Sequence, residues 1–511
     1  MSTAIFSLAT GISRVLGLGR EMVATYYFGA TGKINAFTVA FQLPNLVRAL
    51  VADAALSSAF VPVFSELLEK GERKRAWRVA STLFWLVLLG LGGLTALFML
   101  AAPLLMRPFH PVDLNLAVGL SRVLFPIVAL LGVSGIVVGI LNSYEEFSIP
   151  ALTPVFWNLA IIAGLVLGVP HAHTTDAKLY VYAASILVGT LIQVLLPIPW
   201  LRGRDDRLHF VIDWRDPAVA RTFKMMIPVT LGLGLINVNA VIDTLFASRF
   251  LDPNIAPRAI DLAFRIYMLP QGMFSVAVAT VLFPSLARLA TRNDMNGFRH
   301  TVGLGLRQIA FLLLPASVAA AVLAEPMVRL LYQRGDFTSA QTPVVAGALA
   351  AFTLGLVFNG AMLMLNRAFF SLQSNWVPTG IALGNLGLNA GLDAAFYHFG
   401  VWGIPLATSL VNIAGTVALL VLLRRRIGRI ELGETVRAVA LIAAASAVLA
   451  IVAWPIWHVL DDALGRSTLA QIASLGTALA AGGAAYFVAC KAFRVREIET
   501  LLALRARAPR V

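Results

Sequence analysis

The sequence predicts an all-α protein that crosses a membrane many times, and three observations lead to this fold class. Of the 511 residues, 59% are hydrophobic and only 13% are charged, whereas about a quarter of the residues in soluble proteins are charged. The mean hydropathy is +0.82. Apolar stretches long enough to cross a hydrocarbon layer of ~30 Å recur from one end of the chain to the other. Most of the chain is therefore expected to lie in the membrane.

The apolar stretches predict about 14 spanning helices. Several stretches are longer than the ~20 residues that a straight span needs, which indicates tilted helices or helices that extend beyond the lipid. The expected ranges are 3–28, 36–64, 79–104, 115–142, 151–170, 178–201, 222–249, 258–288, 303–331, 342–370, 377–398, 401–423, 437–458 and 468–490.

The loops between these stretches alternate in their content of Lys and Arg. The rich set is 69–78, 202–207, 424–429 and 491–496, and the poor set is 30–33, 110–113, 171–176, 252–254 and 461–466. Roughly 26 basic residues against roughly 8 place the rich set in the cytoplasm by the positive-inside rule. An even number of spans then predicts that both termini are cytoplasmic. The net charge of +14 follows from this topology and indicates no nucleic-acid partner.

Sequence motifs exclude several other classes. The single cysteine, Cys490, rules out a disulfide framework within the chain. The N-terminal stretch lacks a basic n-region and contains Arg14 and Arg20, so it is expected to be the first helix and not a signal peptide. The chain has no G-x-x-x-x-G-K-[ST] or G-x-S-x-G motif, and its histidines are scattered. We therefore expect no enzyme, no catalytic residue and no cofactor, and a transport step driven by an ion gradient, the membrane potential or consumption of the substrate.

An internal repeat divides the chain. Pro154 follows Asn142 by twelve residues, and Pro378 follows Asn366 by twelve, so the two pairs are 224 residues apart. Further landmarks shift similarly: Pro44 with Pro270, Pro62 with Pro284, and Pro103 with Pro326. Two parallel six-helix lobes are expected, 1–202 and 203–430, around a central cavity that opens alternately to each side. Residues 431–511 add two helices and a basic cytoplasmic tail.

Charged residues occur inside the predicted spans. A charge at bilayer depth costs at least ~2.5–3.5 kcal/mol, so it is expected to face a partner or a cavity. Arg20 and Glu21 are adjacent and fit a structural ion pair equally well. Arg14, Arg48 and Arg265 have no obvious carboxylate in their own spans, although Asp261 lies one turn before Arg265. Because the planar guanidinium matches phosphate, these arginines predict an anionic, phosphate-bearing substrate.

A second polar set lies in later spans and consists of Asp243, Asn389, Asp393 and Thr408. Asn389 and Asp393 are four residues apart, on one face of a helix. Two carboxylates, an amide and a hydroxyl form a hard-oxygen set that suits a small cation. Hydrogen bonds between helices are the structural alternative for the same residues.

Three segments resemble the MurJ/MviN family of the multidrug/oligosaccharidyl-lipid/polysaccharide exporter superfamily. They are SRVLGLGRE (13–21), NAFTVAFQLPNLVRALVADAALSSAFVPVFSE (35–66) and FRIYMLPQGMFSVAVATVLFPSLARL (264–289). The resemblance implies a lipid II flippase of peptidoglycan synthesis and cell shape. Such a flippase moves undecaprenyl-diphosphate-MurNAc-pentapeptide-GlcNAc to the outer leaflet of the bacterial cytoplasmic membrane. It also implies lipid II and membrane lipids as partners, contacts with the cell-wall synthesis machinery, and a monomer.

The resemblance implies roles for individual residues. The substrate-binding positions are Arg14, Arg20, Arg48, Arg265, Asn35 and Asp53. Glu21 would be part of a gating ion pair. Sodium, as a coupling ion, would bind Asp243, Asn389, Asp393 and Thr408. The last two spans would form a hydrophobic groove for the lipid tail.

The chain departs from the family pattern at several acidic positions. The family usually has Asp where this chain has Asn35, and a common Glu is replaced by Met268, whereas Glu21 and Asp53 keep the charge. A cavity with fewer acids is more basic, which questions any gating step that needs an acid–arginine pair there. The alternatives are a flippase for another undecaprenyl-diphosphate glycan and a cation-coupled drug antiporter of the same superfamily. The antiporter would need an acid-rich cavity. A scaffold protein or an enzyme acting on polyprenyl lipids fits the arginines less well.

Overall fold

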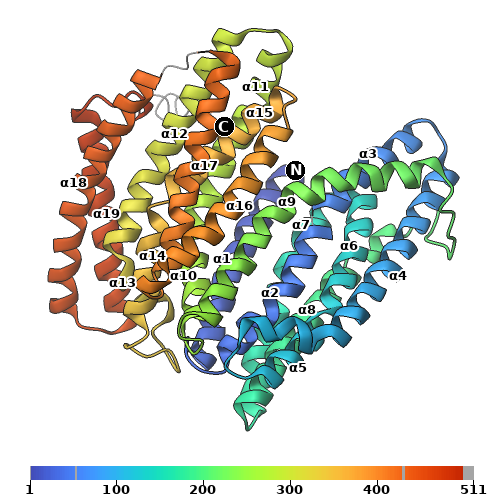
Figure 1. The fold of residues 1–511 in the computed structure, drawn as a ribbon, viewed down its shortest axis with the longest axis horizontal. Helices are drawn as coiled ribbons and strands as arrows, with labels where there is room; N and C mark the ends of the chain where they lie inside the picture. The colour runs from blue at the N-terminus through green and yellow to red at the C-terminus, as the bar shows by residue number, and fades with distance from the viewer. Residues whose placement is uncertain (1, 52–53, 429–431, 499–511) are drawn as a thin grey trace. The chain divides into compact units, whose positions relative to one another are not determined.

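The computed structural model describes residues 2–51, 54–428 and 432–498, and over these residues it contains helices and no β-strand (Figure 1). Nine helical segments of the described chain are long and apolar enough to cross a membrane. There are ten if a pair of helices with a 42° bend counts as one span. The all-helical, membrane-spanning class is therefore confirmed, while the number of about 14 spans stays a prediction.

The chain forms two compact units. Unit 1 takes in Met1–Arg258 and Arg334–Phe337, and unit 2 takes in Ala259–Gln333 and Thr338–Val511. The sequence predicted a boundary between the two lobes at residues 202 and 203, before the helix Pro217–Arg249. That helix belongs to unit 1 because it packs against the second and third helices of the chain. The lobes defined by the repeat stay a prediction.

Unit 1 is built from the first nine α-helices. They are α1 (Ser2–Phe28), α2 (Ile34–Val51), α3 (Ala54–Glu69), α4 (Arg73–Met106), α5 (Leu114–Leu124), α6 (Pro126–Ser143), α7 (Ser148–Gly168), α8 (Thr175–Leu195) and α9 (Pro217–Arg249), with short 3₁₀ turns η1 (Arg107–Phe109), η2 (Val169–His171) and η3 (Ile198–Leu201). The side chains of Asp113, Thr174 and Asp216 accept hydrogen bonds at the N-termini of α5, α8 and α9, which satisfies backbone N–H groups that have no partner within the helix.

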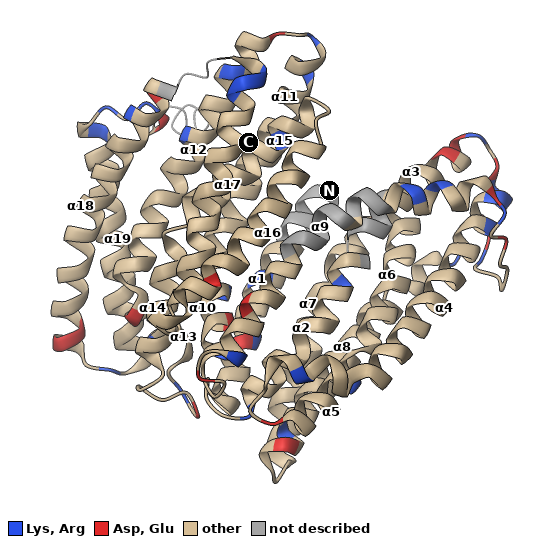
Figure 2. Cartoon of the chain, viewed as in Figure 1, with Lys and Arg blue, Asp and Glu red and all other residues tan. Residues whose placement is uncertain are grey.

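The remaining helices, apart from the start of α10, form unit 2. They are α10 (Ala256–Pro270), a π-helical turn η4 (Gln271–Ser275), α11 (Val276–Thr291), α12 (Met295–Val322), α13 (Ala324–Tyr332), α14 (Thr342–Thr353), α15 (Leu356–Ser371), α16 (Trp376–Phe396), η5 (Tyr397–Phe399), α17 (Gly403–Ile427), α18 (Leu432–Leu464) and α19 (Thr468–Ala492). Figure 2 shows Lys, Arg, Asp and Glu mostly near the ends of helices in each unit, with largely uncharged helix middles.

The pairs of helices that pack together recur in the same order in both units. In unit 1, α3 packs against α6, α4 against α6, and α7 against α8. In unit 2, α11 packs against α15, α12 against α15, and α16 against α17. Helix breaks recur as well. A break separates α5 from α6 in unit 1 and α14 from α15 in unit 2, at matching places in the chain order. The exception is α9, the counterpart of α1, which packs against α2 and α3.

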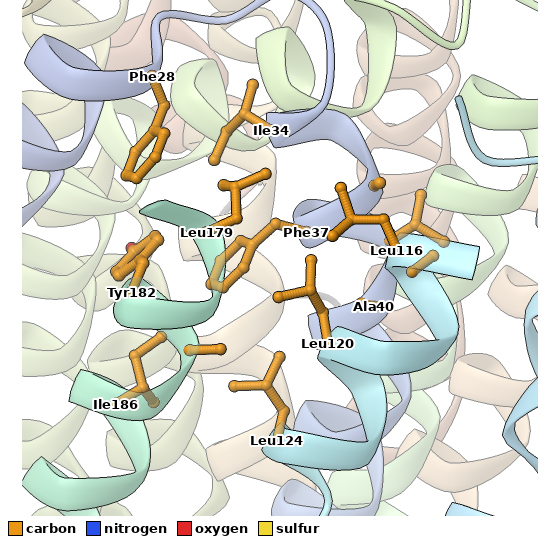
Figure 3. Close-up of a cluster of buried hydrophobic side chains, with 14 of the residues drawn as sticks. Phe28, Ile34, Phe37, Ala40, Leu116, Leu120, Leu124, Leu179, Tyr182 and Ile186 are labelled. Atoms are coloured by element: carbon orange, nitrogen blue, oxygen red, sulfur yellow. The ribbon is translucent and has the colours of Figure 1, made fainter. Parts of the chain in front are cut away.

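An aromatic cluster fixes the ends of α1 and α2 in unit 1 (Figure 3). The ring of Phe37 stacks on Tyr182 with centroids 4.4 Å apart, and Phe28 stacks on the same ring at 5.8 Å. Leu116 and Ile186 are buried in the same cluster. Lipid tails are as apolar as these side chains, so close packing more than escape from water holds the helices together. The cluster therefore fixes the turn that joins α1 to α2.

The C-terminal helices α18 and α19 pack side by side and against α12, as the red and yellow ribbons of Figure 1 show. Arg307 on α12 bonds Glu497 at 3.1 Å, and Arg329 on α13 bonds Asp461 at the end of α18. Tyr486 donates to the carbonyl oxygen of Phe311 at 2.7 Å. Buried ion pairs and this hydrogen bond therefore hold the C-terminal helices and the residues that follow them against α12 and α13.

Candidate functional site

A buried group of charges joins α1 to the start of α10 in unit 1. Arg20 bonds Oε1 of Glu21 through Nε at 3.2 Å and through Nη2 at 2.7 Å. Arg258 bonds the other oxygen, Oε2, at 3.2 Å. The three side chains are 9%, 2% and 2% exposed. One carboxylate is thus held between two guanidinium groups, where removal of any partner would leave a poorly compensated buried charge.

Helix α7 completes the surroundings of Arg20. Nη1 of Arg20 donates to Asn158 at 3.2 Å, and its guanidinium lies 4.7 Å from the ring centroid of Trp157. Asn158 also donates to the carbonyl oxygen of Pro154 on its own helix at 2.9 Å. The Arg20–Glu21 pair that the sequence suggested is therefore present, and Arg20 also holds α1 against α7 through Asn158 and Trp157.

Asn35 is 1% exposed and bonds backbone groups from two loops. Its Nδ2 donates to the carbonyl oxygens of Ala30 at 3.0 Å, Gly32 at 3.2 Å and Asn254 at 2.5 Å. Its Oδ1 accepts the backbone N–H of Arg258 at 2.8 Å. The amide thus ties the α1–α2 turn to the segment before α10. An aspartate could not donate to these carbonyls, which explains in physical terms why an amide suits this position here.

Arg258, Asn158 and Trp157 were missed by sequence reasoning. In the sequence, Arg258 directly follows a proline, a pattern that is typical of a charged residue in an exposed loop. In the structure, it lies in the first turn of α10. A cation at a helix N-terminus opposes the helix dipole. This unfavourable position was a signal that Arg258 has a carboxylate partner elsewhere.

The other expected substrate residues of unit 1 are less buried. Arg14 on α1 is exposed, and Arg48 on α2 is half-buried. Nε and Nη2 of Arg48 donate to Oδ1 of Asn45 at 3.1 and 2.8 Å, one turn earlier on the same helix. Asp53 lies outside the described residues. The substrate-binding role of these positions stays a prediction.

Arg265 of unit 2 has a carboxylate partner on its own helix. Its Nε bonds Asp261 at 3.0 Å, four residues earlier, so the acid noted one turn before this arginine in the sequence is its partner. The side chain of Arg265 is 30% exposed, and Met268, where the family resemblance implies a Glu, is 42% exposed. A guanidinium presents its N–H donors in a planar fork that matches the oxygens of a phosphate or carboxylate.

The expected cation residues fall in both units. Asn389 and Asp393 on α16 are fully buried, and Nδ2 of Asn389 donates to Oδ2 of Asp393 at 3.1 Å. Thr408 on α17 donates to the carbonyl oxygen of Ile404 at 3.4 Å. Asp243 on α9 belongs to unit 1. Within the described ranges, no three His, Cys, Asp or Glu side chains gather as a metal site. The donor set of Asn389 and Asp393 still fits a hard cation.

A charged cluster joins the turn before α2 to the starts of two helices in unit 1. Nζ of Lys33 bonds Asp176 at 2.6 Å and Asp113 at 3.4 Å. Its hydrogen bond to Asp176 raises the pKa of Lys33 above its ordinary value. The backbone N–H of Leu116 lowers the pKa of Asp113, with Lys33 contributing. The cluster holds the turn before α2 to the N-terminal ends of α5 and α8.

The fold and the charges within its apolar helices define a polytopic membrane transport protein. Two solved structures share the fold. "Lipid II flippase MurJ, inward closed conformation" matches with a TM-score of 0.80 and 24% identity over 97% of this chain and 100% of that one. An inward-facing MATE-family transporter matches with a TM-score of 0.68 and 18% identity, over 84% of this chain and 96% of that one.

The chain belongs to the MurJ family, because the family model described as "Lipid II flippase MurJ" matches residues 24–473. The probable lipid II flippases of Buchnera aphidicola and Vibrio cholerae are each 31% identical over 80% of this chain and 80% of their own length. The lipid II flippase of Burkholderia cenocepacia is 31% identical over 74% of each chain. The family resemblance in the sequence is confirmed. Family and apolar helices together make this an inner-membrane protein.

Proposed function

We propose that this protein flips lipid II, the undecaprenyl-diphosphate-linked peptidoglycan precursor, from the cytoplasmic to the outer leaflet. The observation that carries the proposal is the match of the flippase family model over residues 24–473. Relatives that bear this name align over 74–80% of the chain. Arginines on apolar helices supply the charge that a diphosphate needs, because guanidinium groups bind phosphate oxygens in pairs.

About 14 spans would form two six-helix lobes and a C-terminal pair, and flipping would proceed by alternating access. The recurrence of helix packing in the two units supports a parallel repeat. The packing of α9 against α2 and α3 makes α9 the helix that departs from the repeat. The bias of Lys and Arg between loops supports cytoplasmic termini, and we propose that one chain suffices for transport.

Among the arginines, Arg14, Arg48 and Arg265 are the proposed ligands of the diphosphate. Each is at least partly accessible, whereas Arg20 is buried, with its guanidinium enclosed by Glu21 and Asn158. Arg20, Glu21 and Asn35 would then fix the first two helices, and the ion pair of Glu21 would break or form as the protein changes conformation. Asp53 is proposed as a further substrate contact from the family pattern.

Sodium is proposed as the coupling ion. Asn389 and Asp393 would hold it, since their oxygens are buried together on α16, with Thr408 and Asp243 joining them in one conformation. A bound cation would supply charge that neutralises the buried carboxylate of Asp393. Replacing Asp393 with Asn should remove any sodium dependence of transport while leaving the protein folded.

Complementation tests the main proposal. The unmodified protein, expressed in a strain depleted of its own lipid II flippase, should restore growth and accessible lipid II at the outer leaflet. Arg14→Ala, Arg48→Ala and Arg265→Ala should each lower rescue, whereas Arg122→Ala, an exposed arginine of α5, should not. Full rescue by all three variants would remove the arginines from the mechanism.

A flippase for another undecaprenyl-diphosphate glycan is the second candidate. The thioether at Met268 favours it, because it is partly exposed and replaces an acid that the family resemblance implies. Normal membrane insertion without rescue of the depleted strain would support this candidate. A cation-coupled drug antiporter would instead confer drug resistance in the same strain.

A further inference from the structure

A cavity of about 570 Å³ lies in unit 1 where α4 and α9 end. Its lining residues are Arg107, Pro108, His110, Pro111, Leu114 and Arg249. Two of them are arginines, one is a histidine, and none is acidic. The cavity thus places cationic donors beside an apolar wall of two prolines and a leucine.

The two arginines come from different helices. Nη1 of Arg249 donates to the carbonyl oxygen of Pro108 at 3.4 Å, which holds the end of α9 against the η1 turn. Arg107 and Arg249 are both exposed. A guanidinium carries five N–H donors, so this one long contact leaves donors of Arg249 for a ligand. Both arginines also lie at helix C-termini, where a cation is stabilised by the helix dipole.

The topology rule does not account for this charge. The cavity lies at the end of unit 1 that contains the loops 30–33, 110–113 and 171–176, which are poor in Lys and Arg. The positive-inside rule explains clusters on the other side. Two arginines in one cavity on the basic-poor side therefore need another reason.

A stripe of exposed leucines runs along α4 toward the cavity. Leu97, Leu100 and Leu104 are 58%, 79% and 68% exposed, and their spacing places them on one helix face, which continues to Arg107. An acyl chain lying on this stripe would bring its phosphate to Arg107. Free phosphate would bind the arginines without contacting the stripe or the apolar wall.

We propose that this cavity binds the phosphate of an anionic phospholipid, with an acyl chain along Leu97, Leu100 and Leu104. A zwitterionic phospholipid fits less well because no acidic residue lines the cavity to bind its ammonium group. A lipid-linked glycan also fits less well, because Pro108, Pro111 and Leu114 offer few side-chain groups that bind sugars. The bound lipid would link α4 to α9 and restrain the end of α9. This inference does not depend on the transported substrate.

Native mass spectrometry of the purified full chain in detergent tests the proposal. Phosphatidylglycerol should bind the unmodified protein, and the Arg107→Gln/Arg249→Gln double variant should bind it at least five-fold more weakly. Arg122→Gln is the matched control, because Arg122 is exposed but donates to the carbonyl oxygen of Met99 outside the cavity. It should bind like the unmodified protein. The single variant Arg107→Gln, whose side chain is exposed, should show a smaller loss if the double variant fails to fold.

Competition identifies the ligand. Equal phosphatidylglycerol binding by all variants would overturn the site. Equally tight, arginine-dependent binding of phosphatidylethanolamine would overturn the preference for an anionic lipid. Displacement by millimolar inorganic phosphate would show a site for free phosphate, and displacement by equimolar polyprenyl diphosphate would assign the cavity to the transported class of lipid. Each of these results contradicts the proposal, whereas retention of phosphatidylglycerol against both competitors supports it.

Discussion

Oε2 of Glu21 accepts a hydrogen bond from Arg258 at 3.2 Å, across 237 residues of the chain. Oε1 of the same carboxylate accepts from Arg20. Helix α1 and the start of α10 are therefore joined by a charge network that is almost entirely buried. Such a network costs desolvation energy to form, so it depends on all three partners.

Replacement of Glu21 by Gln should destabilise the protein. The change leaves two buried guanidinium groups with a neutral amide between them, and loss of one partner from a buried pair costs about 3–5 kcal/mol. We expect a lower melting temperature in detergent, measured by intrinsic fluorescence. Glu69→Gln, at the exposed end of α3, should leave it unchanged. A melting temperature of Glu21→Gln equal to that of the unmodified protein would contradict a structural role for the network.

Asn35→Asp should also destabilise, because a carboxylate would face the carbonyl oxygens of Ala30, Gly32 and Asn254. A buried polar atom without its hydrogen bond costs about 1–3 kcal/mol, and repulsion between oxygens adds to this. Asn35→Asp should therefore have a lower melting temperature than the control Asn115→Asp, an amide-to-acid change at an exposed position in the first turn of α5. Equal melting of the two variants would show that the amide donors of Asn35 are dispensable.

The sequence predicted the membrane class and the family, and every expected apolar range coincides with one helix or with consecutive helices. The positions of the helices could be predicted because hydropathy and proline positions are local properties of the sequence. The partner of Glu21 could not be predicted, because apolar periodicity says nothing about which helices meet when lipid and helices are equally apolar. For the same reason the packing of α9 in unit 1 was missed. The hydrogen bonds of Asn35 to backbone carbonyls could not be predicted either, because these carbonyls come from a loop more than 200 residues away as well as from its own turn.

The stability of the loop before α9 should depend on pH through Asp216. Its hydrogen bond from Arg75 lowers the pKa of this carboxyl, with the two groups 3.0 Å apart. A lowered pKa in the folded state gives stability above the unfolded pKa of about 3.9, and this stability is lost as the pH falls through the folded value. Melting temperature measured from pH 7 to pH 3 should fall less steeply for Asp216→Asn. Identical slopes would contradict a contribution from this pair.

Gly355 offers a test of close helix packing at the break between α14 and α15. A methyl group there would lie 2.7 Å from the backbone Cα of Ser409 on α17, and the backbone N–H of Gly355 already bonds the hydroxyl of Ser409 at 3.0 Å. Gly355→Ala must therefore push α17 away or break this bond, at a cost of about 1–3 kcal/mol for overpacking.

Gly347 on α14 is the matched control, because a methyl group there meets nothing within 4 Å. Gly347→Ala should keep or raise the melting temperature, since alanine favours helix over glycine by about 1 kcal/mol. Opposite shifts for two identical substitutions eight residues apart would place the cost in the contact with Ser409. A loss of stability in both variants would instead point to the backbone freedom of glycine near the break, and the close approach of α17 would then contribute little.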